Sequence, residues 1–451
     1  MRARLGRRAR LVACVLWCLL AGAAVAWSVV RGVRLQNSHP EVRLGAAPLI
    51  SRRERRGWDW RWSWSIVLAS SVVVAVAWGT WRRWWSRLTW RVLVLVAALG
   101  GAGFAAALAA VDGISGFTRG INHPSEYLAG LADMPPAGEF VDTFVERIND
   151  YLVHVRGHPP GVMLTLRLLD RLGLGGSWPL AVGAVASTAV TVGATLVVVR
   201  AVAGARLARR VVPLLVLAPS VIWMVSSADA MFTAVGMTAT AALAVAVTTA
   251  RRRVSVALAV LGGLLLGWML FLTYLAAVFA IIPAAVVAAV ARRRRSWRPI
   301  RLGLAALAGA AVVVGAFARA GFWWLDGARA TRHEYLEGTP LRSWHYFGVA
   351  NLAVLAIALG PVVVAGGWWV RTRRAWWLIG AAALAVLTMH LSTYTKGEVE
   401  RIWLPFLPLL TVAGAGALDA AGRRGRAVAT SAVLVQGAYG VVLHAALLAK
   451  W

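Results

Sequence analysis

Runs of about twenty apolar residues, separated by short polar segments, recur from one end of the chain to the other. A helix needs roughly 20 apolar residues to cross a hydrocarbon core of about 30 Å, and it satisfies its own backbone hydrogen bonds there. The pattern therefore predicts an all-α, polytopic transmembrane bundle with about 11–13 spans. The candidate spans lie at residues 11–30, 63–81, 90–110, 178–200, 211–226, 229–250, 254–271, 274–291, 301–321, 347–370, 375–391, 402–421 and 427–448.

Composition agrees, since 60% of the 451 residues are hydrophobic. The net charge of +30 comes as short arginine clusters between apolar runs, not as one stripe with interleaved aromatics. This arrangement argues against a nucleic-acid partner and is typical of cytoplasmic loops in a membrane protein. The clusters span residues 2–10, 82–91, 200–210, 251–253, 292–301, 371–374 and 423–426.

A cytoplasmic N-terminus places every arginine cluster inside and the loops 111–177, 322–346 and 392–401 outside. Only Asp419, of 18 acidic residues, then lies inside. Segment 31–62 falls outside although it is rich in arginine, so the topology of residues 1–89 stays open. The alternative is that 63–81 lies in the interface as a hairpin flanked by tryptophans. We expect a core at 90–421 and a last span within 422–451.

The N-terminus has the basic start and apolar core of a signal sequence, with "AVA" as a cleavage-like site. The apolar run is long for a signal, which favours an uncleaved span. Cys14 and Cys18 share one face of this helix, where geometry forbids a mutual disulfide.

Asp112 follows the third apolar run directly, at the start of the largest external loop. A partly desolvated carboxylate at the membrane surface suits a general base. The alternative is an ordinary acid at a helix end.

The stretch 139–161 predicts an amphipathic helix along the outer membrane surface, followed by a short interfacial or re-entrant helix. Asp150 and His154 are spaced to share a metal, but acids facing water give the same pattern, so we expect no cofactor and no metal site. The prolines of "HPPG" would hold His158 at the surface. A histidine that merely occupies a turn is the alternative.

Three further segments carry polar groups. Ser226, Ser227 and Asp229 form a short tip between two apolar runs, suited either to function or to helix capping. Residues 396–401 hold the cations Lys396 and Arg401, which suit a lipid-linked phosphate or an internal salt bridge. Loop 322–346 adds acids, cations and aromatic rings that can stack on sugars, or serves as a spacer. Its charged candidates are Asp326, Arg332, His333 and Glu334.

Four motifs together resemble the GT-C superfamily of integral-membrane glycosyltransferases, and most closely its actinobacterial members. They are "VDG" at 111–113, "GHPPG" at 157–161, "SSAD" at 226–229 and "KGEVERIWLPF" at 396–406. The resemblance covers about residues 90–421. It implies a plasma-membrane enzyme of the cell envelope with an external active site. It also implies inverting sugar transfer from a polyprenyl-phosphate donor to a glycan, lipid or protein acceptor.

The resemblance also implies roles for individual residues. Asp112 matches the catalytic base, although the usual motif is a pair of adjacent acids; Glu126 and Asp150 are the substitutes. The donor phosphate is assigned to Arg401, Lys396, His158 and Arg156. Substrate contacts are assigned to Glu126, Asp150, His154, Asp229, His333 and Glu400.

Other classes of function stay open. A transporter or flippase would carry charges within its spans or paired broken helices, whereas the acids here collect in loops. A glycan polymerase or ligase usually has its large external loop late in the chain, and here it is early. A non-catalytic relative is the remaining alternative.

Overall fold

The computed structural model of the protein describes residues 6–40, 44, 57–225, 227–338, 342–392, 394–419 and 425–448. The described chain is almost wholly helical. Its strands are one two-residue antiparallel pair, β1 (Gly57–Trp58) with β2 (Leu447–Leu448).

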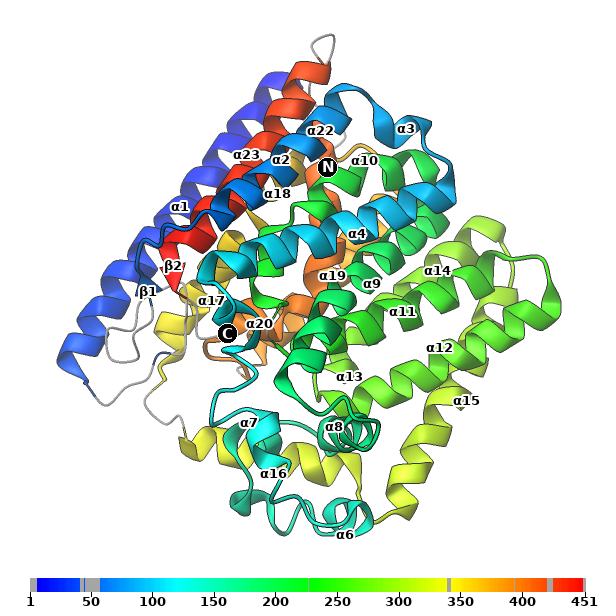
Figure 1. The fold of residues 1–451 in the computed structure, drawn as a ribbon. Helices are drawn as coiled ribbons and strands as arrows, with labels where there is room; N and C mark the ends of the chain where they lie inside the picture. The colour runs from blue at the N-terminus through cyan, green and yellow to red at the C-terminus, as the bar shows by residue number, and fades with distance from the viewer. Residues whose placement is uncertain are drawn as a thin grey trace.

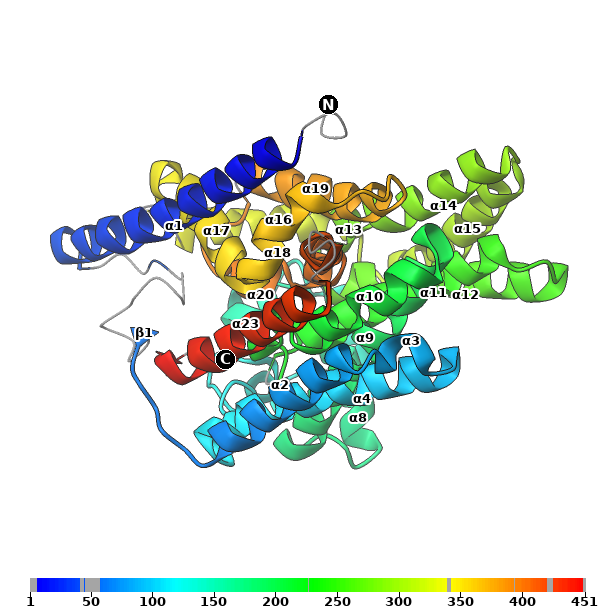
Figure 2. The same cartoon turned by 90° about the horizontal axis from the view of Figure 1, so that it is seen from above.

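Long helices form the body of the molecule (Figures 1 and 2). They are α1 (Arg7–Ser38), α2 (Ser65–Trp81), α4 (Trp90–Ala109), α9 (Ser177–Ala203), α10 (Ala205–Val216), α11 (Asp229–Thr248), α12 (Arg252–Leu272), α14 (Ile281–Arg294), α15 (Arg298–Arg319), α16 (Trp324–Gly338), α17 (Trp344–Leu359), α19 (Ala375–Leu391) and α23 (Gly425–Ala446).

Shorter elements join them. The α-helices are α3 (Trp84–Arg87), α5 (Ser115–Thr118), α6 (Ala137–Asp142), α7 (Val153–Arg156), α8 (Gly161–Arg171), α13 (Ala276–Phe279), α18 (Pro361–Gly366), α20 (Val399–Ile402), α21 (Leu407–Leu410) and α22 (Ala415–Asp419). The 3₁₀ turns are η4 (Ala110–Asp112), η5 (Tyr127–Gly130), η6 (Ile148–Asp150), η7 (Pro219–Trp223), η8 (Gly367–Trp369), η9 (Leu404–Phe406) and η10 (Thr411–Gly414).

Nine helical segments of the described chain are long and apolar enough to cross a membrane, or ten if α17 and the bent segment after it form one span. The predicted fold class, a helical bundle with several candidate membrane spans, is thus confirmed. The number of candidate spans in the described chain is lower than the 11–13 that the sequence suggested. Two expected spans, α2 and α19, are helices of 17 residues, about 25 Å long and at the lower limit for crossing.

The expected span at 211–226 is the clearest error. Its helix, α10, ends at Val216 after 12 residues, and the chain continues as the buried turn η7. Pro219 cannot donate a backbone hydrogen bond, which favours ending the helix before it. Residues 211–216 of α10 and all of η7 are buried, so this run was apolar because it lies inside protein and not because it crosses lipid.

Charge separates the two ends of the bundle. The three loops predicted to be external meet at one end, which we call the acidic end; Figure 1 shows α6, α7, α8 and α16 there as a layer under the other helices. The other end, which we call the arginine end, holds the helix termini at Arg200, Arg252, Arg294 and Arg298. Which end faces the cytoplasm follows only from the charge rule.

The predicted surface helix at 139–161 is wrong as a continuous element. The stretch breaks into α6, η6 and α7, and its apolar residues turn inward. Phe140 and Phe144 join Phe271 and Phe322 in a second hydrophobic core below the bundle. Burying these aromatic rings outweighs the weak local preference for one helix. The short helix expected after "HPPG" is present as α8.

Arg61 fixes the disputed N-terminal segment at the acidic end. Its guanidinium pairs with Asp112 and donates to the carbonyls of His444 and Leu447 in the C-terminal segment. The backbone N–H of Arg61 also donates to Ala445 O at 2.8 Å. Residues 57–61 therefore lie on the same side as loop 111–177, as expected; residues 41–43 and 45–56 of the segment are outside the described chain.

The span expected at 347–370 is broken at Gly360, where the α17 axis turns by 99° into the following segment. Gly360 has a φ of +78°, a conformation that a side chain disfavours. Gln436 of α23 replaces backbone hydrogen bonds that are lost at the break. Its Nε2 donates to Leu359 O at 2.8 Å, and its Oε1 accepts from Val362 N at 3.1 Å.

Replacing Gln436 with Leu should destabilise the protein, because it leaves a carbonyl and an N–H without partners in an apolar interior. Each such group costs about 1–3 kcal/mol, so we expect a lower thermal midpoint of unfolding in detergent. Val435→Leu, at a half-exposed site on the same helix, is the control. Equal midpoints for the two variants would contradict this role.

Candidate functional site

The centre of the acidic end is the buried guanidinium of Arg401, whose side chain is 7% exposed. It forms three ion pairs: Nε with Asp229 Oδ2 at 3.1 Å, Nη1 with Glu126 Oε1 at 3.3 Å, and Nη2 with Glu398 Oε2 at 3.5 Å. A buried charge is tolerated only when it is paired, so Arg401 draws these carboxylates together. We call Glu126, His154, Asp229, Glu398 and Arg401 the Arg401 cluster.

The members of the cluster come from distant parts of the chain. Glu126 precedes η5 in the first large loop, and His154 lies in α7. Asp229 is the first residue of α11, where Ser227 Oγ accepts from its N–H at 3.1 Å and donates to its Oδ2 at 2.7 Å. Of the predicted tip, Ser227 and Asp229 are buried; Ser226 lies outside the described residues.

His154 lies between the guanidinium and a carboxylate. Its Nε2 lies 3.3 Å from Arg401 Nη2, which can only donate, and its Nδ1 lies 3.0 Å from Glu126 Oε1. Nε2 therefore accepts from the guanidinium, and Nδ1 faces the carboxylate of Glu126. A carboxylate, a histidine and a guanidinium are thereby linked in sequence.

His158 lies beside the cluster as a neutral imidazole. Its Nδ1 is 3.0 Å from Leu272 O, so Nδ1 carries the proton and Nε2 is an acceptor. Desolvation lowers the pKa of His158 to about 4, against the smaller opposing effect of Asp229. Tyr127 and Phe232 enclose the ring. A neutral ring brings no positive charge to a phosphate, so this arrangement does not favour the cationic role expected for His158.

The first large loop also positions Tyr127 against the cluster. Burial raises the pKa of this phenol, and the negative charges of Asp229 and Glu126 raise it further. Three carboxylates surround one guanidinium, so the cluster carries more acidic than basic groups and disfavours an anion beside it.

Asp112 belongs to a different cluster, with Arg61, Arg119 and His444. Its side chain is 8% exposed; one oxygen pairs with Arg61, and the other lies 3.3 Å from Arg119 and 4.0 Å from His444 Nε2. Within the described ranges this group shares no residue with the Arg401 cluster. The sequence predicted Asp112 as a site residue but not Arg61, which lies in an irregular segment without a motif.

The remaining predicted residues lie around the rim. Arg156 Nη1 pairs with Glu334 of α16 at 3.4 Å. The backbone of Lys396 is held by α16 and the next segment, since its N–H donates to Tyr335 Oη at 2.9 Å and its carbonyl accepts from Arg342 at 2.7 Å. Helix α16 is therefore bonded to the first large loop at Arg156 and to the later loop at Lys396. Glu400 is buried close by.

Two groups of residues have the chemistry of metal ligands. The first, Asp150 and His154, was weighed from the sequence; Asp150 pairs with Arg147 at the surface at 3.2 Å, whereas His154 faces Glu126. His333, Glu334 and Glu337 bring three ligand atoms within 4.8 Å of one another on α16. Glu334 already pairs with Arg156, and His333 and Glu337 are exposed.

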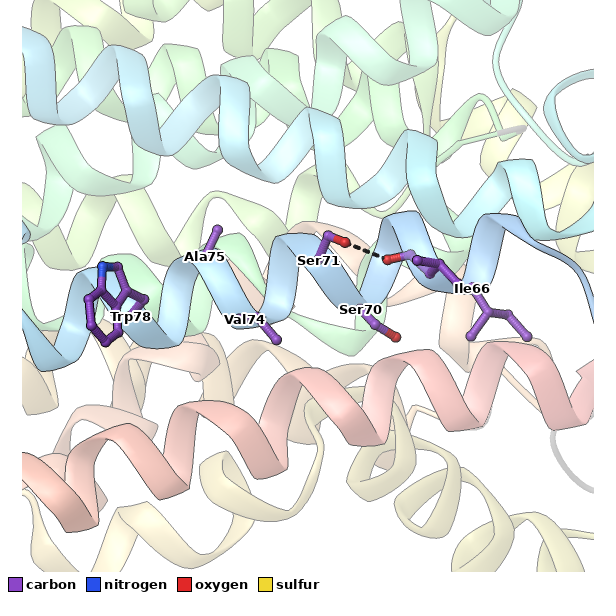
Figure 3. A pocket seen from close by; sticks show the side chains of 7 residues that line it. Ile66, Ser70, Ser71, Val74, Ala75 and Trp78 are labelled. Atoms are coloured by element: carbon purple, nitrogen blue, oxygen red, sulfur yellow. Dashed lines mark hydrogen bonds between the residues drawn. The ribbon is translucent and has the colours of Figure 1, made fainter.

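A shallow hollow of about 570 Å³ lies along α2 (Figure 3). All its lining residues belong to this one helix, and the polar ones, Ser70 and Ser71, are uncharged. The hydroxyl of Ser71 donates to its own helix at Val67 O. The hollow offers an apolar surface and no group for chemistry.

Comparisons with known proteins leave the site to be judged by its geometry. The chain matches no protein-family model, and it matches no curated protein at a significant level.

The lowered pKa of His158 predicts a loss of stability in acid. A folded-state pKa of about 4 lies below the usual 6.5, so the unfolded chain binds the proton more readily, and stability falls as the pH drops from about 6.5 to 4. We expect this residue to account for roughly 2 kcal/mol of that loss, allowing for its partial exposure.

The measurement is the thermal midpoint of unfolding between pH 7.5 and 4.5 for the wild type and His158→Gln. The variant should show a shallower decline, while His333→Gln, on an exposed helix face, should follow the wild type. Parallel curves for the wild type and His158→Gln would contradict the assignment.

Proposed function

We propose that this protein is a membrane glycosyltransferase that moves a sugar from a polyprenyl-phosphate donor to an acceptor hydroxyl at the acidic end. The observation that carries the proposal is the Arg401 cluster, a carboxylate–histidine–guanidinium assembly buried where the loops meet the helix bundle. A lipid-linked sugar would present its reacting bond at this depth, with the lipid in the bilayer.

Direct displacement is the reaction that suits such a site. A carboxylate removes the proton of the acceptor hydroxyl, and the acceptor oxygen attacks the anomeric carbon. The bond from this carbon to the phosphate oxygen breaks, and its electron pair leaves with the lipid phosphate. The anomeric configuration inverts.

Glu126 suits the role of base better than Asp112 does. Two arginines share the carboxylate of Asp112, so both of its oxygens are already engaged by cations. Glu126 instead shares one guanidinium with two other carboxylates and also contacts His154, a side chain that can relay a proton. Asp112 would then anchor the N-terminal segment through Arg61.

The cations of the site are also assigned two different roles. The charge of Arg401 is already balanced by carboxylates, so Arg401 is proposed as a positioning residue that orients Glu126 and Asp229. The leaving phosphate is assigned to the rim cations Lys396 and Arg156, which are less buried than Arg401.

A transporter is the second candidate, because one span is broken at Gly360. Transporters of this kind place ion or substrate sites at paired breaks near the middle of the membrane. In the described chain, the backbone groups freed at this break are satisfied by Gln436. The ionisable cluster lies instead at the acidic end, which favours surface chemistry.

The variants Glu126→Gln and Asp112→Asn discriminate between the two bases. With a polyprenyl-phosphate sugar and membranes containing each variant, Glu126→Gln should lower transfer by 10²-fold or more, and Asp112→Asn should lower it less. Thermal unfolding of each variant controls for misfolding. The reverse order would restore Asp112 as the base, and undiminished transfer in both variants would remove the proposal.

Cysteine labelling tests the side on which the reaction occurs. In a chain whose Cys14 and Cys18 are replaced by Ala, Glu337→Cys at the acidic end should react with a membrane-impermeant maleimide in intact cells. Ser296→Cys at the arginine end should react only after permeabilisation. The opposite labelling would overturn the proposal of an external active site.

A further inference from the structure

The arginine end carries a basic surface that the proposed reaction does not use. Helix α14 ends there with Arg292, Arg293 and Arg294, and residues 371–374, which hold three more arginines, precede α19. Of the acids in the described chain, only Asp419 lies at this end. Cations without nearby acids need counter-ions from outside the protein.

Three guanidinium groups come close together in this surface. Helices α14 and α19 pack against each other, which brings Arg374 beside the end of α14. Arg293 is repelled by both Arg294 and Arg374. Within the described ranges, no carboxylate pairs with any of the three.

The neighbouring helices hold two of these side chains in place. Arg293 Nη1 donates to Ala201 O near the end of α9 at 3.2 Å, and Arg294 Nη2 donates to Thr248 O at the end of α11 at 2.7 Å. These bonds complement the negative ends of the two helices. Each guanidinium has five N–H donors, so most of its donors stay available for another acceptor.

We propose that Arg293, Arg294 and Arg374 form a binding site for the phosphate headgroup of an anionic phospholipid. Arginine binds phosphate oxygens through a planar fork of donors. The three residues lie where the α14 span ends, which is the depth of lipid headgroups. Trp297, 76% exposed beside them, has the size and polarity of an interfacial anchor.

The test measures binding of phosphatidylglycerol and phosphatidylcholine to the purified full-length protein by native mass spectrometry. The wild type should bind phosphatidylglycerol more tightly than phosphatidylcholine. A basic residue near an anionic lipid contributes about 1 kcal/mol, or about five-fold in Kd. We expect about a five-fold weaker Kd for Arg374→Gln and roughly thirty-fold for Arg293→Gln with Arg374→Gln.

Two further variants separate charge from fold. Arg293→Lys with Arg374→Lys should keep most of the binding, and Arg171→Gln with Arg319→Gln, both exposed at the acidic end, should leave it unchanged. Equal affinity for the two lipids, wild-type binding by Arg374→Gln, or an equal loss in the acidic-end control would each overturn the proposal. Because no sugar transfer is measured, its failure would not bear on the glycosyltransferase.

Discussion

The pairing of the buried Arg401 guanidinium is the interaction on which the acidic end depends. An unpaired charge in the interior costs several kcal/mol, so a fold that buries Arg401 must bring carboxylates to it. They come from the loop before η5, from the start of α11 and from the residue before α20. One side chain thus ties the first loop to two parts of the helical body.

The same pairing sets the chemistry that surrounds it. Arg401 donates to Nε2 of His154, whose other ring nitrogen faces the carboxylate of Glu126. His158, enclosed by Tyr127 and Phe232, stays neutral and offers an acceptor. The groups suited to proton transfer therefore gather in one buried place, and the rim cations Lys396 and Arg156 lie on loops that α16 holds beside it.

Separation of charge organises the molecule as a whole. Acids and histidines concentrate at one end, and arginines cap helix ends at the other, where Arg293 and Arg294 bind carbonyls of α9 and α11. Some arginines also lie at the acidic end; among them, Arg61 is held by Asp112 and by two C-terminal carbonyls. The N-terminal and C-terminal segments meet there through β1 and β2.

The sequence by itself determined the class of fold, because apolar runs of about twenty residues require helices in a membrane. It also singled out nearly every polar group of the site, since Glu126, His154, Asp229 and Arg401 are conspicuous in so apolar a chain. Only the tertiary structure decided that these residues meet and that Asp112 stands apart with Arg61, because ion pairs between distant segments leave no periodic trace. The span predicted at 211–226 was wrong for a related reason. Hydropathy indicates that a segment is removed from water, but it does not distinguish burial inside the protein from burial in lipid.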